Sequence, residues 1–185
     1  MNRRAVVKKL LSKRDNLLVV AGLGSTAWDC TAAGDSPLTF PMWGAMGQAA
    51  MTGLGLALAQ PKRRVLVITG DGEALMGLGA LATIGVQKPE NLTVVVIDNE
   101  RYGETGMQDT HTAHGIDLAG VARACGFKTL DYEDLPEAVH KDPGPNFIVV
   151  KVKAEKIPLV LPPREGALLK ARFRRALLGP EADAE

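Results

Sequence analysis

Short apolar runs alternate along the chain with longer segments in which apolar and polar residues are mixed. The strongest runs begin at Leu17, Val65, Leu92 and Phe147, and each is nearly continuous. Such runs predict strands that are buried on both faces, as in a parallel sheet with helices on either side. The alternation therefore predicts an α/β fold, with three layers in the order α/β/α and a mostly parallel central sheet of about six strands.

The segments between these runs predict the remaining elements. Helices are expected over 3–12, 44–60, 74–86, 117–125 and 135–140, and shorter strands over 38–40 and 127–130. Beyond residue 157 the pattern changes, because a pair of prolines opens a basic amphipathic segment from Glu165 to Leu178. We therefore expect an α/β domain over 1–157 and a basic helical tail over 158–185, whose apolar stripe packs on this chain or on a partner.

Composition and charge exclude several classes of protein. Apolar residues make up 46% of the 185 residues, which is enough for one sizeable core. The net charge of +1 argues against nucleic-acid binding, and no apolar run is long enough to span a membrane. The basic segment 1–14 lacks the long apolar stretch of a signal peptide. Because Cys30 and Cys125 have neither metal-binding nor redox spacing, we expect a protein of the reducing cytoplasm.

Polar residues follow two of the predicted strands at the point where each strand ends. The run 65–69 leads into Gly70-Asp71-Gly72-Glu73, and the run 92–97 leads into Asp98-Asn99-Glu100-Arg101. The carboxyl ends of parallel strands share one edge of the sheet, which is where open α/β sheets bind ligands. A carboxylate, an amide oxygen and a backbone carbonyl suit Mg²⁺, and the helix that opens at 72–73 has an N-terminus suited to a phosphate.

This pair of motifs resembles the signature of thiamine diphosphate-dependent enzymes. The resemblance implies that Asp71, the Asn99 side chain and the Arg101 carbonyl bind the Mg²⁺ that holds the cofactor's diphosphate. The flanking residues become cofactor-binding candidates: Gly70, Gly72, Glu73, Tyr102 and Gly103. Many members of the family have Asn where this chain has Asp98, and the role of that extra carboxylate stays open.

Two upstream segments resemble other parts of the same cofactor site. The segment 40–47 resembles the stretch that binds the aminopyrimidine ring, with the Gly44 carbonyl as hydrogen-bond acceptor and Met46 as the apolar wedge that bends the cofactor; a core methionine on a Gly-rich helix is the alternative. After the first strand, Gly24, Ser25 and Thr26 resemble a diphosphate-binding turn. An ordinary strand-to-helix turn with a Ser or Thr cap is the alternative there.

Three further residues are catalytic candidates on the same predicted edge. His111 and His114 follow the metal-binding strand, and histidine transfers protons near neutral pH or binds anionic groups. Their spacing does not suit a helical zinc site, and inert surface histidines are the alternative. Glu104 either caps the following helix or faces the reacting carbon.

The family resemblance also implies a partner. In these enzymes a Glu that activates the cofactor belongs to a separate pyrimidine-binding domain, and this chain is long enough for the diphosphate-binding domain alone. The resemblance is closest to the separately encoded β subunits of sulfopyruvate decarboxylase, and next to phosphonopyruvate decarboxylase. We therefore expect the thiamine diphosphate- and Mg²⁺-binding subunit of a 2-oxo acid decarboxylase. It would need an α-type subunit for activity, in a hetero-oligomer such as α2β2 or larger.

Three alternatives to this function remain. The chain could belong to a related carboligase that resembles acetolactate synthase, or to a phosphonopyruvate decarboxylase. It could instead be a non-catalytic cofactor-binding or regulatory subunit. A plain nucleotide-binding domain of the flavodoxin type is disfavoured, because Met46 and Asn99 would then match the cofactor motifs by coincidence.

Overall fold

The computed structural model describes residues 1–135 and 137–183, and its centre is a six-stranded sheet. All neighbouring strands of this sheet are parallel, in the order β2-β1-β3-β4-β8-β7. The predicted fold class is therefore confirmed. The strands are β1 (Leu18–Ala21), β2 (Thr39–Pro41), β3 (Val65–Gly70), β4 (Leu92–Asp98), β7 (Lys128–Thr129) and β8 (Asn146–Lys151).

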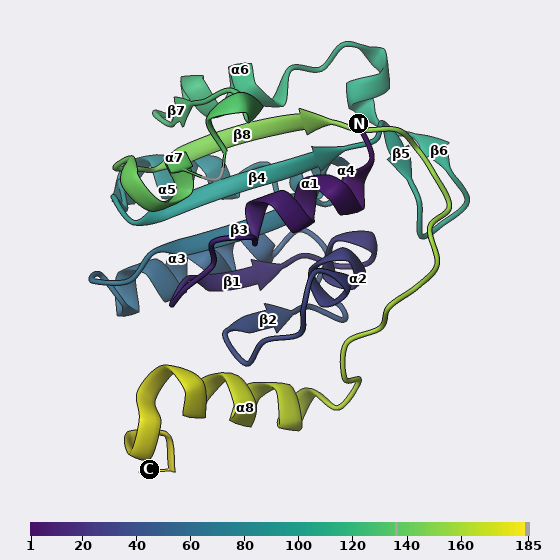
Figure 1. Cartoon of the computed structure of the whole chain (residues 1–185). Helices are drawn as coiled ribbons and strands as arrows, with labels where there is room; N and C mark the ends of the chain where they lie inside the picture. Colours follow the sequence, from purple (N-terminus) through teal and green to yellow (C-terminus); the bar gives the residue numbers. More distant parts are fainter. Residues whose placement is uncertain (136, 184–185) are drawn as a thin grey trace.

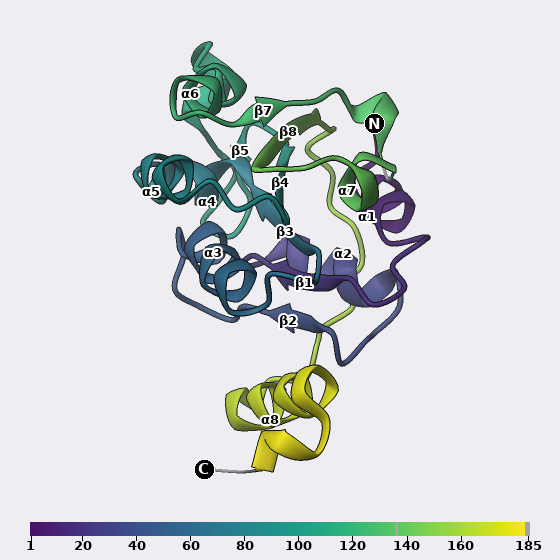
Figure 2. The ribbon, with the colours of Figure 1, turned by 90° about the vertical axis from the view of Figure 1, so that its left-hand side faces the viewer.

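Helices cover both faces of the sheet (Figures 1 and 2). One face carries α1 (Arg3–Leu10), α2 (Ser25–Ala32) and α7 (Glu137–Lys141). The other face carries α3 (Ala49–Ala59), α4 (Asp71–Met76), α5 (Ala80–Gln87) and α6 (Leu118–Ala124). The helix expected over 135–140 begins later than predicted, and position 136 lies outside the described residues.

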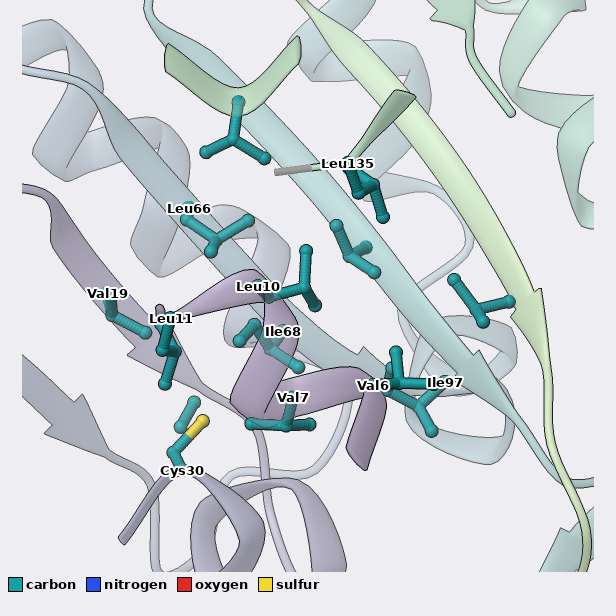
Figure 3. Close-up of a cluster of buried hydrophobic side chains, with 14 of the residues drawn as sticks. Val6, Val7, Leu10, Leu11, Val19, Cys30, Leu66, Ile68, Ile97 and Leu135 are labelled. Carbon is teal, nitrogen blue, oxygen red and sulfur yellow. The ribbon is translucent and has the colours of Figure 1, made fainter. Parts of the chain in front are cut away.

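Aliphatic side chains fill the two layers between the helices and the sheet. Figure 3 shows one of them, in which Val6, Val7 and Leu10 of α1 lie against Leu66 and Ile68 of β3. All five side chains are almost fully buried, and burying each contributes about 1.5–3 kcal/mol through the hydrophobic effect. This layer holds the start of the chain firmly against the sheet.

Two of the predicted helices are interrupted by breaks in the structure. The helix expected over 44–60 begins only at Ala49, because Ala45 and Gly47 have positive φ angles of 53° and 90° that end any helical path. The helix expected over 74–86 is divided into α4 and α5 around Gly77. The two breaks meet in space, since a Cβ on Gly77 would overlap the Gly47 carbonyl.

The chain beyond β8 runs without regular structure to α8 (Gly166–Leu178), which lies beside the edge strand β2 (Figure 2). Phe173 of α8 packs edge-to-face on Phe40, with ring centroids 5.6 Å apart, and Arg172 forms two hydrogen bonds with Asp35. The apolar stripe of the tail therefore packs on this chain and covers a sheet edge that would otherwise be open. Positions 184 and 185 lie outside the described residues.

Short elements complete the described chain. Two small strands form an antiparallel hairpin after β4, β5 (Arg101–Tyr102) and β6 (Gln108–Asp109). Three single 3-10 turns are η1 (His111–His114), η2 (Tyr132–Asp134) and η3 (Gly179–Asp183). None of the helices in the described ranges is long and apolar enough to cross a membrane.

Candidate functional site

An open cleft lies at the carboxyl ends of β3 and β4, where the sequence predicts a ligand site. It encloses about 600 Å³, including the space open to solvent. Most of the predicted site residues line it, although they come from four separate segments. These residues are Ser25, Met46, Gly70, Asp71, Gly72, Glu73, Asn99, Arg101, Tyr102, Gly103 and Glu104. The cleft lining does not include Gly24, Thr26, Gly44, His111 or His114.

Hydrogen bonds link the three metal-ligand candidates. The backbone N–H of Asn99 donates to Oδ1 of Asp71 at 3.4 Å, and the N–H of Arg101 donates to the Asn99 side-chain oxygen at 2.9 Å. Asp71 is 2% exposed. Burial raises the pKa of Asp71, the hydroxyl of Thr110 lowers it, and the charge of Asp98 raises it further. A raised pKa marks a carboxylate that gains from a nearby cation.

A buried network that the sequence analysis did not identify supports this carboxylate. The Thr110 hydroxyl donates to Oδ2 of Asp71 at 2.6 Å, and the Thr112 hydroxyl donates to Oδ1 of Asp98 at 2.8 Å. Lys151 forms an ion pair with the other oxygen of Asp98 at 2.9 Å. Both oxygens of Asp98 are thus engaged away from the cleft. The only sequence signal for this network was the pair of threonines two positions apart in the segment after β4, and such pairs are too common to indicate a site.

Glu73 is buried beside the cleft and braces the turn that follows β1. Its Oε2 accepts hydrogen bonds from the Thr69 hydroxyl at 2.8 Å and from the Leu23 N–H at 3.1 Å. Burial raises its pKa, and the hydrogen bond from Thr69 opposes that shift. A side chain on Gly22 would collide with this carboxylate, which requires glycine there. The carboxylate therefore supports the backbone of the turn.

The turn 24–26 opens α2 at the cleft wall. Gly24 is the residue before the helix and has a φ of 78°, a conformation that glycine adopts readily. Ser25 begins the helix and lines the cleft. The hydroxyl of Thr26 instead donates to the Gly22 carbonyl at 2.7 Å, within its own helical turn. Of the two hydroxyls, that of Ser25 is the one placed at the cleft.

Met46 and Tyr102 also line the cleft, the former from a loop and the latter from β5. Met46 lies in the loop before α3 rather than on a helix, while Gly44 is exposed in the same loop. The Tyr102 ring packs so closely on Gly72 that a Cβ there would come within 2.5 Å of the ring. Gly72 thus lets the loop after β4 approach the start of α4.

The three catalytic candidates lie in different surroundings. His111 and His114 belong to the 3-10 turn η1 and are exposed, and His114 Nε2 lies 3.7 Å from Oδ2 of Asp109. Thr110, just before that turn, and Thr112 within it are buried, whereas neither histidine is part of the cleft lining. Glu104 lines the cleft. Burial raises its pKa, and the positive charge of Arg3 opposes that shift.

Several known decarboxylases are similar to this chain in sequence or in fold. Sulfopyruvate decarboxylase subunit beta of Methanothermobacter thermautotrophicus is 40% identical over 83% of both chains. Phosphonopyruvate decarboxylase of Streptomyces viridochromogenes is 36% identical over 97% of this chain, which spans 47% of that longer protein. The structure of benzoylformate decarboxylase from Polynucleobacter necessarius shares the fold, with a TM-score of 0.68 at 22% identity over 86% of this chain and 34% of that one.

A family model decides the assignment. Residues 24–151 match the model described as thiamine pyrophosphate enzyme, C-terminal TPP binding domain; thiamine pyrophosphate is another name for thiamine diphosphate. The matched range contains most of the cleft lining, the metal-ligand candidates and all strands of the sheet except β1, whereas Arg3 and Leu23 of the lining precede it. This chain therefore belongs to the thiamine pyrophosphate enzymes, through their C-terminal cofactor-binding domain.

Proposed function

We propose that this chain is the thiamine diphosphate- and Mg²⁺-binding subunit of a 2-oxo acid decarboxylase, and that sulfopyruvate is its substrate. The observation that carries the proposal is the contact between Asp71 and Asn99 at the ends of two neighbouring parallel strands. The substrate is inferred from the relative in Methanothermobacter, which covers most of this chain.

The residues at the cleft fit Mg²⁺ and the diphosphate. Asp71, the Asn99 side chain and the Arg101 carbonyl offer only oxygen atoms, which Mg²⁺ prefers to nitrogen or sulfur ligands. No cluster of three or more His, Cys, Asp or Glu side chains occurs in the described ranges, so a softer metal lacks a comparable site there. Ser25 and the glycines at 70 and 72 let backbone and hydroxyl donors approach an anion closely.

Each group of residues has a proposed task. Thiamine diphosphate, when bound, supplies a nucleophilic carbon and accepts the electron pair released with carbon dioxide. Met46 would support the bend between the two cofactor rings, and the Gly44 carbonyl would accept a hydrogen bond from the amino group of the pyrimidine ring. Glu104 is the proton-transfer candidate nearest the cleft, whereas His111 and His114 would serve the substrate only when a second chain or a loop movement brings them to it.

The same reasoning leads us to propose a partner. Three relatives are named beta subunits, and the longer phosphonopyruvate decarboxylase includes a further half that this chain does not match. We propose that a separate pyrimidine-binding α-type subunit supplies the activating Glu, in a hetero-oligomer such as α2β2 or larger. We also propose that the chain divides into a domain over 1–157 and a tail over 158–185. A cytoplasmic location belongs to the same proposal and is consistent with the free thiols of Cys30 and Cys125.

Phosphonopyruvate is the second candidate substrate, because similarity to its decarboxylase extends over 97% of this chain. Both substrates are 2-oxo acids that carry a second anionic group. Substrate specificity can be tested by assembling this chain with its partner and measuring carbon dioxide release from each acid. We expect a higher kcat/KM for sulfopyruvate. Equal or better turnover of phosphonopyruvate would overturn the substrate assignment while leaving the cofactor role intact.

The cofactor role has its own test. Titration calorimetry should show thiamine diphosphate binding that requires Mg²⁺ and that is lost in Asp71→Ala. Asp35→Ala is the matched control, since Asp35 lies on the surface and pairs with Arg172 of α8. Mg²⁺-dependent binding of unchanged affinity in Asp71→Ala would contradict the proposal.

A further inference from the structure

A nearly buried arginine at the start of the chain lines the cofactor cleft. Arg3 stands in the first turn of α1 and is only 7% exposed. Its Nε donates to Oδ2 of Asp29 at 2.7 Å, which fixes the guanidinium at the cleft wall. The same side chain lines a second cavity that adjoins the cleft and also borders on Ser25 and Asn99. Arg3 therefore stands where the diphosphate-binding turn meets the metal-ligand candidates.

Contacts within the described residues engage only part of the Arg3 guanidinium group. Asp29 is 1% exposed and pairs with two arginines, because its Oδ1 accepts from Arg4 Nε at 2.9 Å. One carboxylate thus pairs with two guanidinium groups, so Asp29 offsets only part of their combined positive charge. Arg4 uses a terminal nitrogen to donate to the Pro158 carbonyl at 2.7 Å. The terminal nitrogens of Arg3, in contrast, make no hydrogen bond with any described residue.

We propose that Arg3 binds the diphosphate of the cofactor with its terminal nitrogens, an inference that rests on the proposed function. A guanidinium presents paired N–H donors that match two phosphate oxygens, and it stays charged when it is buried. Mg²⁺ neutralises only part of the charge of a diphosphate, and Ser25 at the start of α2 adds uncharged donors alone. Arg3 supplies the missing positive charge.

The position of Glu104 supports this assignment. Its carboxylate lies against Gly24, where a Cβ would come within 2.6 Å of the Glu104 Oε1 atom, and its loop is exposed. Burial raises the pKa of Glu104 and the positive charge of Arg3 lowers it, so the two side chains are near enough to interact. An acidic side chain at this place competes with a bound anion. Removing its charge should therefore strengthen anion binding.

Binding of inorganic pyrophosphate with Mg²⁺ to the full chain tests the proposal by titration calorimetry. Arg3→Gln should weaken binding about tenfold or more, as expected for the loss of a charged hydrogen-bond donor. Arg4→Gln is the matched control, because it also removes one ion pair to Asp29 but lies outside both cavities, and it should change affinity less than about twofold. Glu104→Gln should bind pyrophosphate more tightly than the wild type.

A second readout separates charge from folding. The dependence of pyrophosphate affinity on salt should become shallower in Arg3→Gln and stay unchanged in Arg4→Gln, since only the former loses a charge that meets the anion. Arg3→Lys keeps the charge and should recover part of the affinity. Thermal unfolding checks that each variant is folded, and Arg3→Lys keeps the test available should Arg3→Gln fail to fold.

Three results would contradict the assignment of Arg3 to the diphosphate or the proposed function on which it rests. If Arg3→Gln and Arg4→Gln weakened pyrophosphate binding equally, Arg3 would act only through its ion pair with Asp29. Unchanged pyrophosphate binding in Arg3→Gln, with a raised KM for the 2-oxo acid in the assembled enzyme, would move the contact from the cofactor to the substrate anion. The proposed function itself would be contradicted if the wild type showed no Mg²⁺-dependent pyrophosphate binding, or if Asp71→Ala left that binding unchanged.

Discussion

Thr110 donates a hydrogen bond of 2.6 Å to Oδ2 of Asp71, and both side chains are almost fully buried. This bond occupies one oxygen of the carboxylate and turns the other, Oδ1, towards Asn99 and the cleft. The orientation of the proposed metal ligand is thus set by a residue 39 positions later in the chain.

Thr110→Val should weaken Mg²⁺-dependent cofactor binding about 10- to 100-fold, the range typical of residues that orient a metal ligand. Valine has nearly the same shape, so the loss comes from the missing hydroxyl. Calorimetric titration of Mg²⁺ at saturating cofactor measures it. Thr31→Val is the control, because the Thr31 hydroxyl bonds only within α2. Equal affinities in both variants would show that Asp71 needs no such support.

Asp98 is expected to influence the metal site through its charge rather than as a ligand, since Thr112 and Lys151 engage both its oxygens. Asp98→Asn should therefore retain Mg²⁺ binding, whereas Asp71→Asn should lose most of it. Mg²⁺ titrations of both variants at neutral pH provide the comparison. Loss of binding in Asp98→Asn as severe as in Asp71→Asn would make Asp98 a ligand.

The pH dependence of metal binding follows from the raised pKa of Asp71. Burial and the charge of Asp98 both raise it, so the folded chain takes up this proton more readily than the unfolded chain. The contribution of Asp71 to stability is therefore fully present below its unfolded pKa and is lost as the pH rises through the folded pKa. Mg²⁺ requires the ionised form, so metal affinity should fall as the pH drops through the folded pKa. Asp98→Asn should shift that fall to lower pH, and an unchanged midpoint would exclude the coupling.

The two thiols should differ strongly in reactivity. Cys30 is 1% exposed, and burial raises its pKa to about 12, whereas Cys125 is partly exposed. Because the thiolate is the reactive form, an aromatic disulfide reagent at pH 8 should modify Cys125 in the native protein and Cys30 only after unfolding. The Cys125→Ser variant isolates the slow thiol. Rapid reaction of Cys30 in that variant would show that the layer under α1 opens readily.

Gly77→Ala should destabilise the protein by about 1–3 kcal/mol, because the new Cβ would overlap the Gly47 carbonyl. It should also disturb the loop that carries Met46. Gly79→Ala is the matched control: it has open space and a helical conformation, so it should leave stability unchanged or raise it by about 0.4–1 kcal/mol. Chemical denaturation of both variants measures the difference, and equal stabilities would mean that the two loops separate easily.

The sequence by itself determined the sheet and the pairing of Asp71 with Asn99 at the carboxyl ends of two of its strands. Runs such as those of β3 and β4 are apolar throughout, and only a strand covered on both faces buries every side chain of such a run. Once the strands are parallel, Asp71 and Asn99 must share an edge, because each directly follows a strand end. These inferences need only local pattern and chain direction.

The tertiary structure decided everything that depends on contact between distant segments. At the break before α3, Gly47 lies against Gly77, and no local pattern shows that contact. Sequence distance also hides Arg3, which reaches the cleft only because α1 packs on the sheet. The loop after β4 illustrates the same limit, since its 3-10 turn buries Thr112 and leaves His111 exposed. Local periodicity selects the elements, whereas the side chains that meet in a site are selected by packing between elements.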